Sequence, residues 1–234
     1  MEWFAVTLDM YRRVVTQAGA LAWRNWLVLG SVFAYSAIIF VTASLAGLFG
    51  IAGGLLVSVV SSACFGSFLY LVEMIVQTTR ATWEDFRRSF FVYVWDVVGV
   101  SFVLWVFWQL AGPVLATLPQ GRVIALCLKI LMVVLFNAVP ELIYLGHFTV
   151  LALLSESYQF ITENWIEWFP PNIAVIGFVL VLWELPLSGL VGSALQTAAI
   201  ALFVYFAMVM RGLLFLELSG STRRARAFRH KMGR

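Results

Sequence analysis

The chain has 234 residues, of which 62% are hydrophobic and only 12% are charged, and its formal net charge is +3. Water-soluble domains carry roughly 25% charged residues, so this composition leaves too few polar side chains to cover a soluble globule. We therefore predict an all-α integral membrane protein, in line with the mean hydropathy of +0.95. Cys64 and Cys127 lie within apolar segments and are expected to be buried thiols rather than a disulfide.

The first residues predict an amphipathic helix over 3–18, lying on the membrane surface or packed on the protein's own cytoplasmic face. The long apolar run begins only after Arg24, which is not the pattern of a cleaved signal peptide. About 20 apolar residues suffice to cross the hydrocarbon layer. From the apolar stretches and the turns between them we predict six transmembrane helices, at residues 26–48, 55–77, 92–111, 123–145, 172–185 and 193–218.

Two proline-containing segments are expected to end helices. Gly112-Pro113 follows the third span directly, and Pro170-Pro171 follows a second amphipathic segment at residues 155–168. Since proline lacks the N–H of a helical hydrogen bond, we expect the third span to stop before Pro113 and the fifth span to start only after Pro171.

The most polar internal stretch, residues 79–93, predicts a short helix in the membrane interface. Thr82 can cap its start. Trp83 then falls on an aromatic side, while Arg87 and Arg88 fall on the other side, where they can contact lipid headgroups or a partner. The tail at 219–234 adds further basic residues of the same kind, among them Arg223, Arg224, Arg226, Arg229 and Lys231.

Basic residues concentrate on the cytoplasmic side of membrane proteins. Placing both termini in the cytoplasm puts nearly all of the extramembrane arginines there and leaves only Arg122 in the outer turns. We predict a multi-pass protein of the bacterial inner membrane with this topology. Anionic headgroups, other membrane proteins or further copies of the chain are the expected partners, and nucleic acid is not.

Two stretches of the chain follow the same order of elements. Asn25-Trp26 and Asn164-Trp165 lie 139 residues apart, and each pair follows an amphipathic segment and precedes two spans. The pattern predicts a single transmembrane domain over 1–234. Its repeat-like halves, about 3–90 and 142–230, run in the same direction and are joined by spans three and four.

The segments around Glu73, Arg80-Ala-Thr-Trp-Glu-Asp-Phe-Arg-Arg-Ser-Phe, Leu154-Ser-Glu-Ser-Tyr and Arg211-Gly-Leu-Leu-Phe resemble bacterial six-span membrane proteins. That group includes the membrane domain attached to some glycerophosphodiester phosphodiesterases and related uncharacterised stand-alone families. The resemblance implies a six-helix all-α fold. It implies no activity, because the phosphodiesterase catalytic domain is absent from this chain.

Ionisable residues within spans are candidate functional groups, because an unpaired charge in the membrane is costly. Four of them, Glu73, Asp96, Glu141 and Arg211, are expected at similar depth in the cytoplasmic half, with Glu73 and Arg211 close together. Lys129 and Glu184 are expected to pair in the outer half. These groups either fix the register of the helices or line a polar pathway or ligand pocket.

Asn137 and Pro140 predict a kink in the fourth span. The sequence contains no metal-binding, phosphate-binding or nucleophile motif, so we predict no cofactor and no metal, while a bound lipid is compatible with the interfacial residues. The leading hypothesis is a non-enzymatic structural or accessory subunit, or a lipid-interacting scaffold. The alternative is a small transporter or permease component that uses the buried charges.

Overall fold

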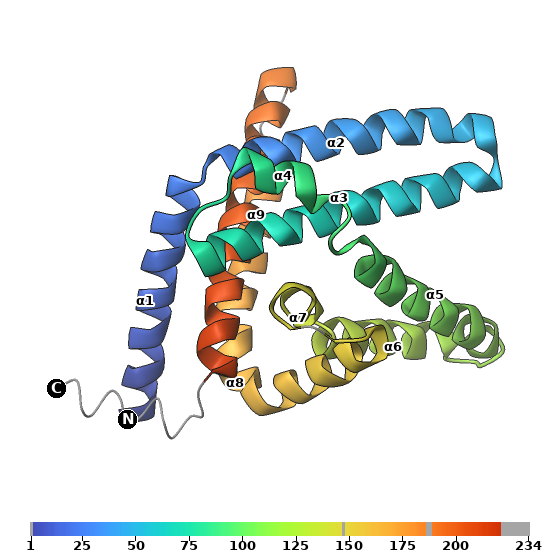
Figure 1. Cartoon of the computed structure of the whole chain (residues 1–234). Coiled ribbons are helices and arrows are strands. Elements are labelled where there is room, and N and C mark those ends of the chain that lie inside the picture. Colours follow the sequence, from blue (N-terminus) through green and yellow to red (C-terminus); the bar gives the residue numbers. More distant parts are fainter. Residues whose placement is uncertain (1, 147, 186–188, 221–234) are drawn as a thin grey trace. The chain divides into compact units, whose positions relative to one another are not determined.

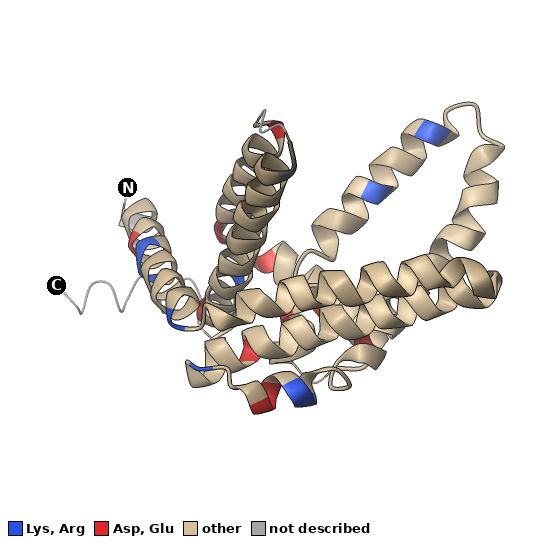
Figure 2. Cartoon of the chain, turned by 90° about the horizontal axis from the view of Figure 1, so that it is seen from above, with Lys and Arg blue, Asp and Glu red and all other residues tan. Residues whose placement is uncertain are grey.

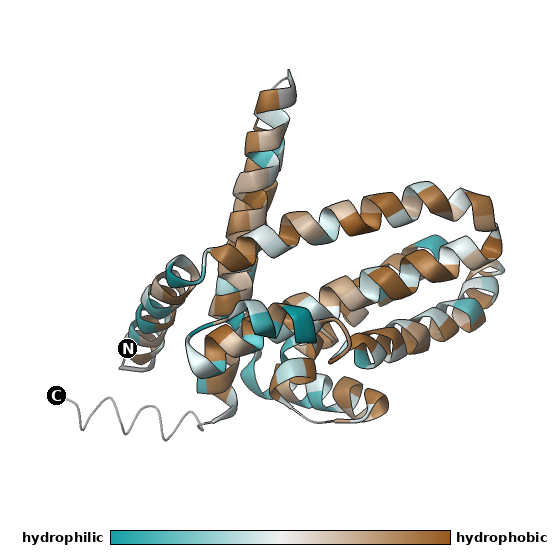
Figure 3. Ribbon diagram, turned by 45° about the horizontal axis from the view of Figure 1, so that its top comes forward, coloured by the Kyte–Doolittle hydropathy of each residue, from teal (hydrophilic) through white to brown (hydrophobic). Residues whose placement is uncertain are grey.

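The structure, a computed structural model, describes residues 2–146, 148–185 and 189–220. Within these ranges the regular structure is helical, and six helices are long and apolar enough to cross a membrane. The predicted fold class is thereby confirmed, and the chain is a multi-pass integral membrane protein. Hydrophobic residues dominate these six helices, whereas the short helix at 83–89 is strongly hydrophilic (Figure 3). The six candidate spans are Leu27–Phe49, Ile51–Thr78, Val94–Ala116, Gly121–Leu145, Val150–Glu184 and Val191–Ser219.

The elements follow one another with short connections (Figure 1). Their bounds are α1 (Glu2–Arg24), α2 (Leu27–Ala46), the 3₁₀ turn η1 (Gly47–Phe49), α3 (Ile51–Thr78), α4 (Trp83–Ser89), α5 (Val94–Ala116), α6 (Gly121–Leu135), α7 (Val139–Leu145), α8 (Val150–Glu184) and α9 (Gly189–Ser219).

The chain divides into two compact units that alternate along the sequence. The first unit comprises residues 1–34, 71–82 and 164–234, and the second comprises 35–70 and 83–163. The division passes through α2, α3 and α8, so each of these helices contributes to both units. It differs from the repeat-like halves expected from the sequence, which stay a prediction.

In the first unit, α1 packs along α9 (Figure 1). Its buried residues lie on one face, as a helix with one covered side requires; they are Thr7, Met10, Val14, Ala18, Leu21 and Ala22. A neighbouring apolar stripe remains exposed and consists of Phe4, Leu8 and Val15. Thus α1 packs on α9, another helix of the same chain, which is one of the two arrangements expected from the sequence. Its second apolar stripe stays exposed.

In the second unit, Tyr35 of α2 ties together α3 and α4. Its hydroxyl shares a hydrogen bond with the Ser67 hydroxyl at 2.6 Å, and Ser67 in turn bonds to the Ser89 hydroxyl. The Tyr35 ring lies 6.0 Å from the Phe86 ring and 5.8 Å from the Phe90 ring. α4 begins at Trp83, directly after Thr82. Phe86 of α4 and Phe90, which follows the helix, cover the Tyr35 ring.

Both helix ends expected from proline are wrong. α5 continues through Pro113 to Ala116, and α8 continues through Pro170 and Pro171 to Glu184. Proline fixes φ near its helical value, and the loss of an N–H is tolerated in a membrane helix where another donor replaces it.

The expectation that both cysteines are buried holds for Cys64 but is wrong for Cys127, which is exposed. The apolar surface of α6 can face lipid, which is as apolar as a protein core.

Asn25 joins three segments of the first unit. Its side-chain amide donates to the Leu21 carbonyl at 2.9 Å and to the Thr79 carbonyl at 3.1 Å. Its side-chain oxygen accepts from the Ala81 N–H at 2.9 Å. Tyr205 of α9 donates to the Asn25 carbonyl at 3.1 Å. Asn25 is only 5% exposed, so these bonds fix the corner between α1 and α2 against the end of α3.

Thr79, which follows α3, has a φ of 66° and is the one non-glycine residue with positive φ in the described part of the chain. A β-branched residue is strained in this left-handed region. We expect Thr79→Gly to raise the free energy of unfolding by about 0.5–1 kcal/mol, because relief of strain exceeds the added flexibility of the unfolded chain.

The measurement is the thermal midpoint in detergent or nanodiscs. Gln77→Gly, in the last turn of α3, is the matched control and should lower stability by about 1 kcal/mol. Equal destabilisation by both glycines would contradict the assignment of strain to Thr79.

Candidate functional site

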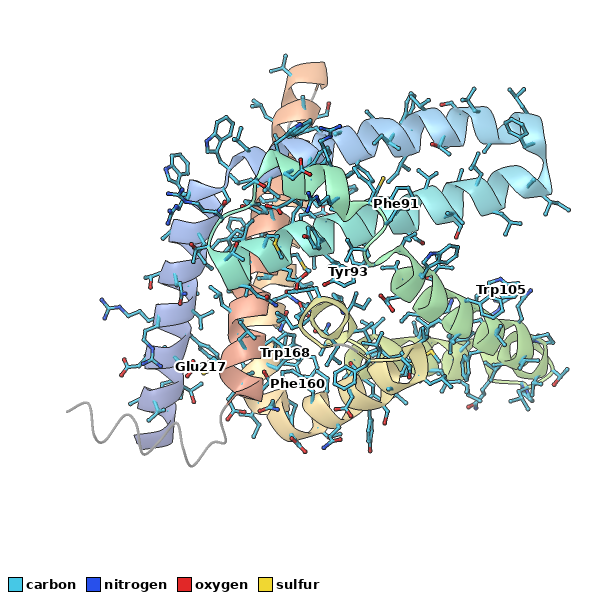
Figure 4. All side chains as sticks on the ribbon, viewed as in Figure 1. Phe91, Tyr93, Trp105, Phe160, Trp168 and Glu217 are labelled. Atoms are coloured by element: carbon cyan, nitrogen blue, oxygen red, sulfur yellow. The ribbon has the colours of Figure 1, made fainter. Side chains whose placement is uncertain are left out.

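Arg211, within the sixth candidate span, is held by two groups of α8. Its Nη1 donates to Asn172 Oδ1 at 3.1 Å, and its guanidinium lies 5.1 Å from the centre of the Trp168 ring. Asn172 Nδ2 donates in turn to the Trp168 carbonyl at 2.6 Å. Trp168 is fully buried and lies toward α9 (Figure 4). This arrangement attaches the charge of α9 to α8 through a hydrogen bond and a cation–π contact.

The other predicted members of the cytoplasmic-half cluster lie in both units. Glu73 on α3 is 8% exposed and belongs to the first unit with Arg211, and their mutual approach stays a prediction. Glu141 on α7 is fully buried, and Asp96 in the first turn of α5 is half-buried; both belong to the second unit. The expected common depth of all four groups therefore stays a prediction too.

Lys129 and Glu184, expected to pair in the outer half, also belong to different units. Lys129 is exposed on α6, and its ammonium lies 5.4 Å from the centre of the Trp108 ring. Glu184 is the last residue of α8 and is exposed. The structure thus assigns Lys129 an aromatic contact that the sequence did not predict, and the pairing stays a prediction.

At the diproline of α8, a residue of α1 supplies a hydrogen bond. Pro171 has no N–H to donate to the carbonyl of Glu167, four residues earlier. The Tyr11 hydroxyl donates to that carbonyl at 2.7 Å. A side chain 156 residues away in sequence therefore supplies a donor that the helix itself lacks, and the same bond fastens α1 to α8 within the first unit.

Tyr11 remains a donor over a wide pH range. Burial, with a smaller contribution from the nearby negative charge of Glu167, raises the pKa of Tyr11 to about 12 from its ordinary value of 10.0. Both effects disfavour the phenolate, so the hydroxyl keeps its proton at neutral pH.

Pro140 interrupts the fourth candidate span, where residues 136–138 separate α6 from α7. Pro140 has no N–H for the Phe136 carbonyl, and the Val139 N–H donates there instead, at 3.2 Å. The Leu135 carbonyl, which Val139 would serve in a regular helix, accepts from the Ser157 hydroxyl of α8 at 2.9 Å. Ser157, which is fully buried, supplies the missing donor, and nothing in the sequence pattern predicted this role.

The carboxyl end of α8 is capped from α9. Gln196 Nε2 donates to the carbonyls of Leu182 and Trp183, both at 2.8 Å. The last carbonyls of a helix have no intrahelical donor, and a membrane offers few others. Gln196 thereby joins the first turns of α9 to the last turn of α8.

The interfacial residues predicted to contact headgroups or partners are placed only in part. Trp83, Arg87 and Arg88 of α4 are exposed, and Arg88 Nε donates to Glu84 at 2.8 Å in an exposed ion pair. The basic tail residues named above lie outside the described part of the chain.

The described residues contain no group of three or more histidine, cysteine, aspartate or glutamate side chains able to hold a metal ion. The chain matches no protein-family model, no curated protein and no solved structure. The resemblance to bacterial six-span proteins therefore stays a prediction. Chemically, the site consists mainly of side chains that donate hydrogen bonds to backbone carbonyls of helices.

Replacing Tyr11 by phenylalanine should lower the free energy of unfolding by about 1–2 kcal/mol, because it removes a donor to a partly buried carbonyl. In a Pro171→Ala background the new N–H can serve Glu167 directly. There Tyr11→Phe should lower the free energy of unfolding by less than about 0.5 kcal/mol. The difference between the effects in the two backgrounds is the coupling energy of the double-mutant cycle.

Thermal or denaturant unfolding of the four proteins in one detergent measures this coupling. Tyr158→Phe, at an exposed tyrosine of α8, is the control and should change stability little. An equal cost of Tyr11→Phe in both backgrounds would refute the link between the hydroxyl and the proline.

Proposed function

We propose that this protein is a non-enzymatic membrane protein that acts by packing against other membrane proteins, as a structural or accessory subunit or a lipid-interacting scaffold. One observation carries the proposal. Trp105 lies at the midpoint of α5 and is 57% exposed, with Phe102 beside it at 5.9 Å between ring centres.

Tryptophan in membrane proteins is enriched at the headgroup level, where its N–H meets polar groups. An exposed tryptophan at mid-span has no such polar layer beside it. At protein interfaces, by contrast, tryptophan is enriched among the residues that dominate binding. Trp105 and Phe102 therefore suit an intramembrane contact with another chain better than contact with acyl tails alone.

The burial of the candidate spans supports the same proposal. In α3 and in the span within α9, 44% of the most apolar window is buried, against 6% in the span of α2 and 11% in that of α5. Helices with so little cover from their own chain offer a wide apolar surface to lipid or partners.

The distribution of charge supports a bacterial inner-membrane location with both termini in the cytoplasm. Charged residues are sparse on the candidate spans (Figure 2), and most of the basic ones lie in α1, in the segment between α3 and α5, and in the tail. If all six candidate helices cross, these three regions lie on one side, which the positive-inside rule assigns to the cytoplasm.

The second candidate, a small transporter or permease component, is favoured by one specific observation. Glu73 and Glu141 are 8% and 0% exposed within candidate spans, and carboxylates at membrane depth often mark ion or proton pathways.

A photo-crosslinking residue in place of Trp105 should form a discrete protein adduct in native membranes, and the same protein should co-purify in stoichiometric amount in nanodiscs. Trp23, 81% exposed at the end of α1, is the matched position outside the spans and should form no such adduct. Adducts to lipid alone at Trp105, with no co-purifying protein, would contradict a subunit role.

The variants Glu73→Gln and Glu141→Gln separate the two candidate functions. In a structural protein we expect loss of thermal stability or of partner assembly, since removing charge from a buried, paired group commonly costs more than 1 kcal/mol. Retained fold and assembly, together with loss of an ion or solute flux in proteoliposomes, would instead favour the transporter.

A further inference from the structure

The corner between α1 and α2 lies beside the stretch that follows α3, within the first unit (Figure 1). Asn25 at this corner donates to the Thr79 carbonyl at 3.1 Å and accepts from the Ala81 N–H at 2.9 Å. Arg80 lies between these two residues, and Arg24 precedes Asn25 directly. Covalent dimensions along this bridge keep the Cα atoms of the two arginines within about 13 Å of each other. Two long arginine side chains at this separation can reach one ligand together.

α2 places this corner at the edge of the hydrocarbon layer. The helix begins at Leu27, contains 20 residues and carries no charge. At the helical rise per residue it is about 30 Å long, which is the thickness of the hydrocarbon core. When α2 crosses the membrane, Leu27 therefore lies at the boundary and Arg24 lies just outside it. The Asn25 bonds keep Arg80 at the same level, close to Thr78, where the α3 span ends.

Exposed tryptophans mark the same level. Trp23 and Trp26 lie on either side of Arg24 in the sequence and are 81% and 62% exposed. Tryptophan is enriched at the headgroup level, where its ring contacts acyl chains and its N–H meets polar groups. Trp26 and Leu27, which is 72% exposed, give the first carbons of an acyl chain an apolar surface next to Arg24.

Both guanidinium groups are available to a ligand. Arg24 and Arg80 are exposed, and neither forms an ion pair, a side-chain hydrogen bond or a ring contact with any residue that the structure describes. Two positive charges held close together repel each other, and a ligand with two negative charges removes that repulsion. A zwitterionic headgroup would instead bring its own ammonium toward the second arginine.

We propose that this corner binds the headgroup of an anionic phospholipid that carries two negative charges, with Arg24 and Arg80 both donating charge-assisted hydrogen bonds to its phosphate oxygens. A headgroup of this kind has either two linked phosphodiesters or one phosphomonoester. A single phosphodiester carries one charge and leaves one arginine uncompensated. The site needs no partner protein, so it goes beyond the proposed subunit role and does not depend on it.

The full chain is reconstituted into phosphatidylethanolamine nanodiscs that also contain phosphatidylglycerol, with one phosphodiester, and a doubly charged lipid, in amounts that supply equal phosphate. The doubly charged lipid is cardiolipin in one preparation and phosphatidic acid in another. Retained lipid is counted by native mass spectrometry after gentle detergent extraction. We expect a doubly charged lipid to be enriched about fivefold over phosphatidylglycerol, the effect of one further charge near a membrane surface. Comparison of the two preparations shows whether the corner takes two linked phosphates or one phosphomonoester.

Arg24→Gln and Arg80→Gln should each remove this preference, and the double variant should remove no more, because one headgroup needs both charges. Arg122→Gln is the matched control, because Arg122 is a single exposed arginine at the start of the span that begins with α6. It should leave the ratio unchanged. Circular dichroism checks the helical content of each variant.

Three results would each overturn the proposal. The first is equal retention, per phosphate, of phosphatidylglycerol and both doubly charged lipids by the unchanged protein, a comparison that needs no variant. The second is an equal effect of Arg122→Gln and Arg24→Gln. The third is a partial loss in each single variant that adds up in the double variant, since the arginines would then bind separate lipids.

Discussion

Backbone carbonyls inside a membrane need donors from the protein itself, because lipid tails offer none. This constraint is met by another helix at three points where a helix contains proline, breaks or ends. The carbonyl of Glu167 receives the Tyr11 hydroxyl where Pro171 has no N–H, and the carbonyl of Leu135 receives Ser157 beside the break at Pro140. Gln196 serves the end of α8 in the same way. Each of these bonds comes from another helix, so the irregular points are also the points at which helices are fastened together.

Two asparagines of the first unit also serve the backbone in a common way. Asn25 and Asn172 each donate to the carbonyl four residues earlier and each accept from a distant group, the Ala81 N–H in one case and Arg211 in the other. Such bonds satisfy the backbone and fix the register of neighbouring segments at once. A side chain used in this manner is a structural element first, and this favours a function that resides on the protein's outer surfaces, such as the face around Trp105.

The features that the sequence predicted correctly depend on residues close together in the chain. Apolar length predicted six spans, and the position of Thr82 predicted the start of α4, whose rings do fall together. The sequence could not predict that α8 continues through its prolines. The local rule considers only the hydrogen bond that proline removes from its own helix, whereas the replacement donor, Tyr11, lies 156 residues from Glu167. The roles of Ser157 and Asn25 were missed for the same reason: their partners come from segments distant in sequence, and nothing in their immediate neighbourhood marks them.

The carbon chemical shift of the Glu167 carbonyl tests the central claim most directly. Carbonyl-¹³C glutamate with ¹⁵N tryptophan selects Glu–Trp pairs, of which the sequence has two, at Glu2-Trp3 and Glu167-Trp168. A carbonyl that accepts a hydrogen bond resonates downfield of one that does not. The account predicts that Tyr11→Phe moves one of the two solid-state signals upfield and leaves the other in place. Two unmoved signals in a folded protein would show that α1 does not supply the donor at the diproline.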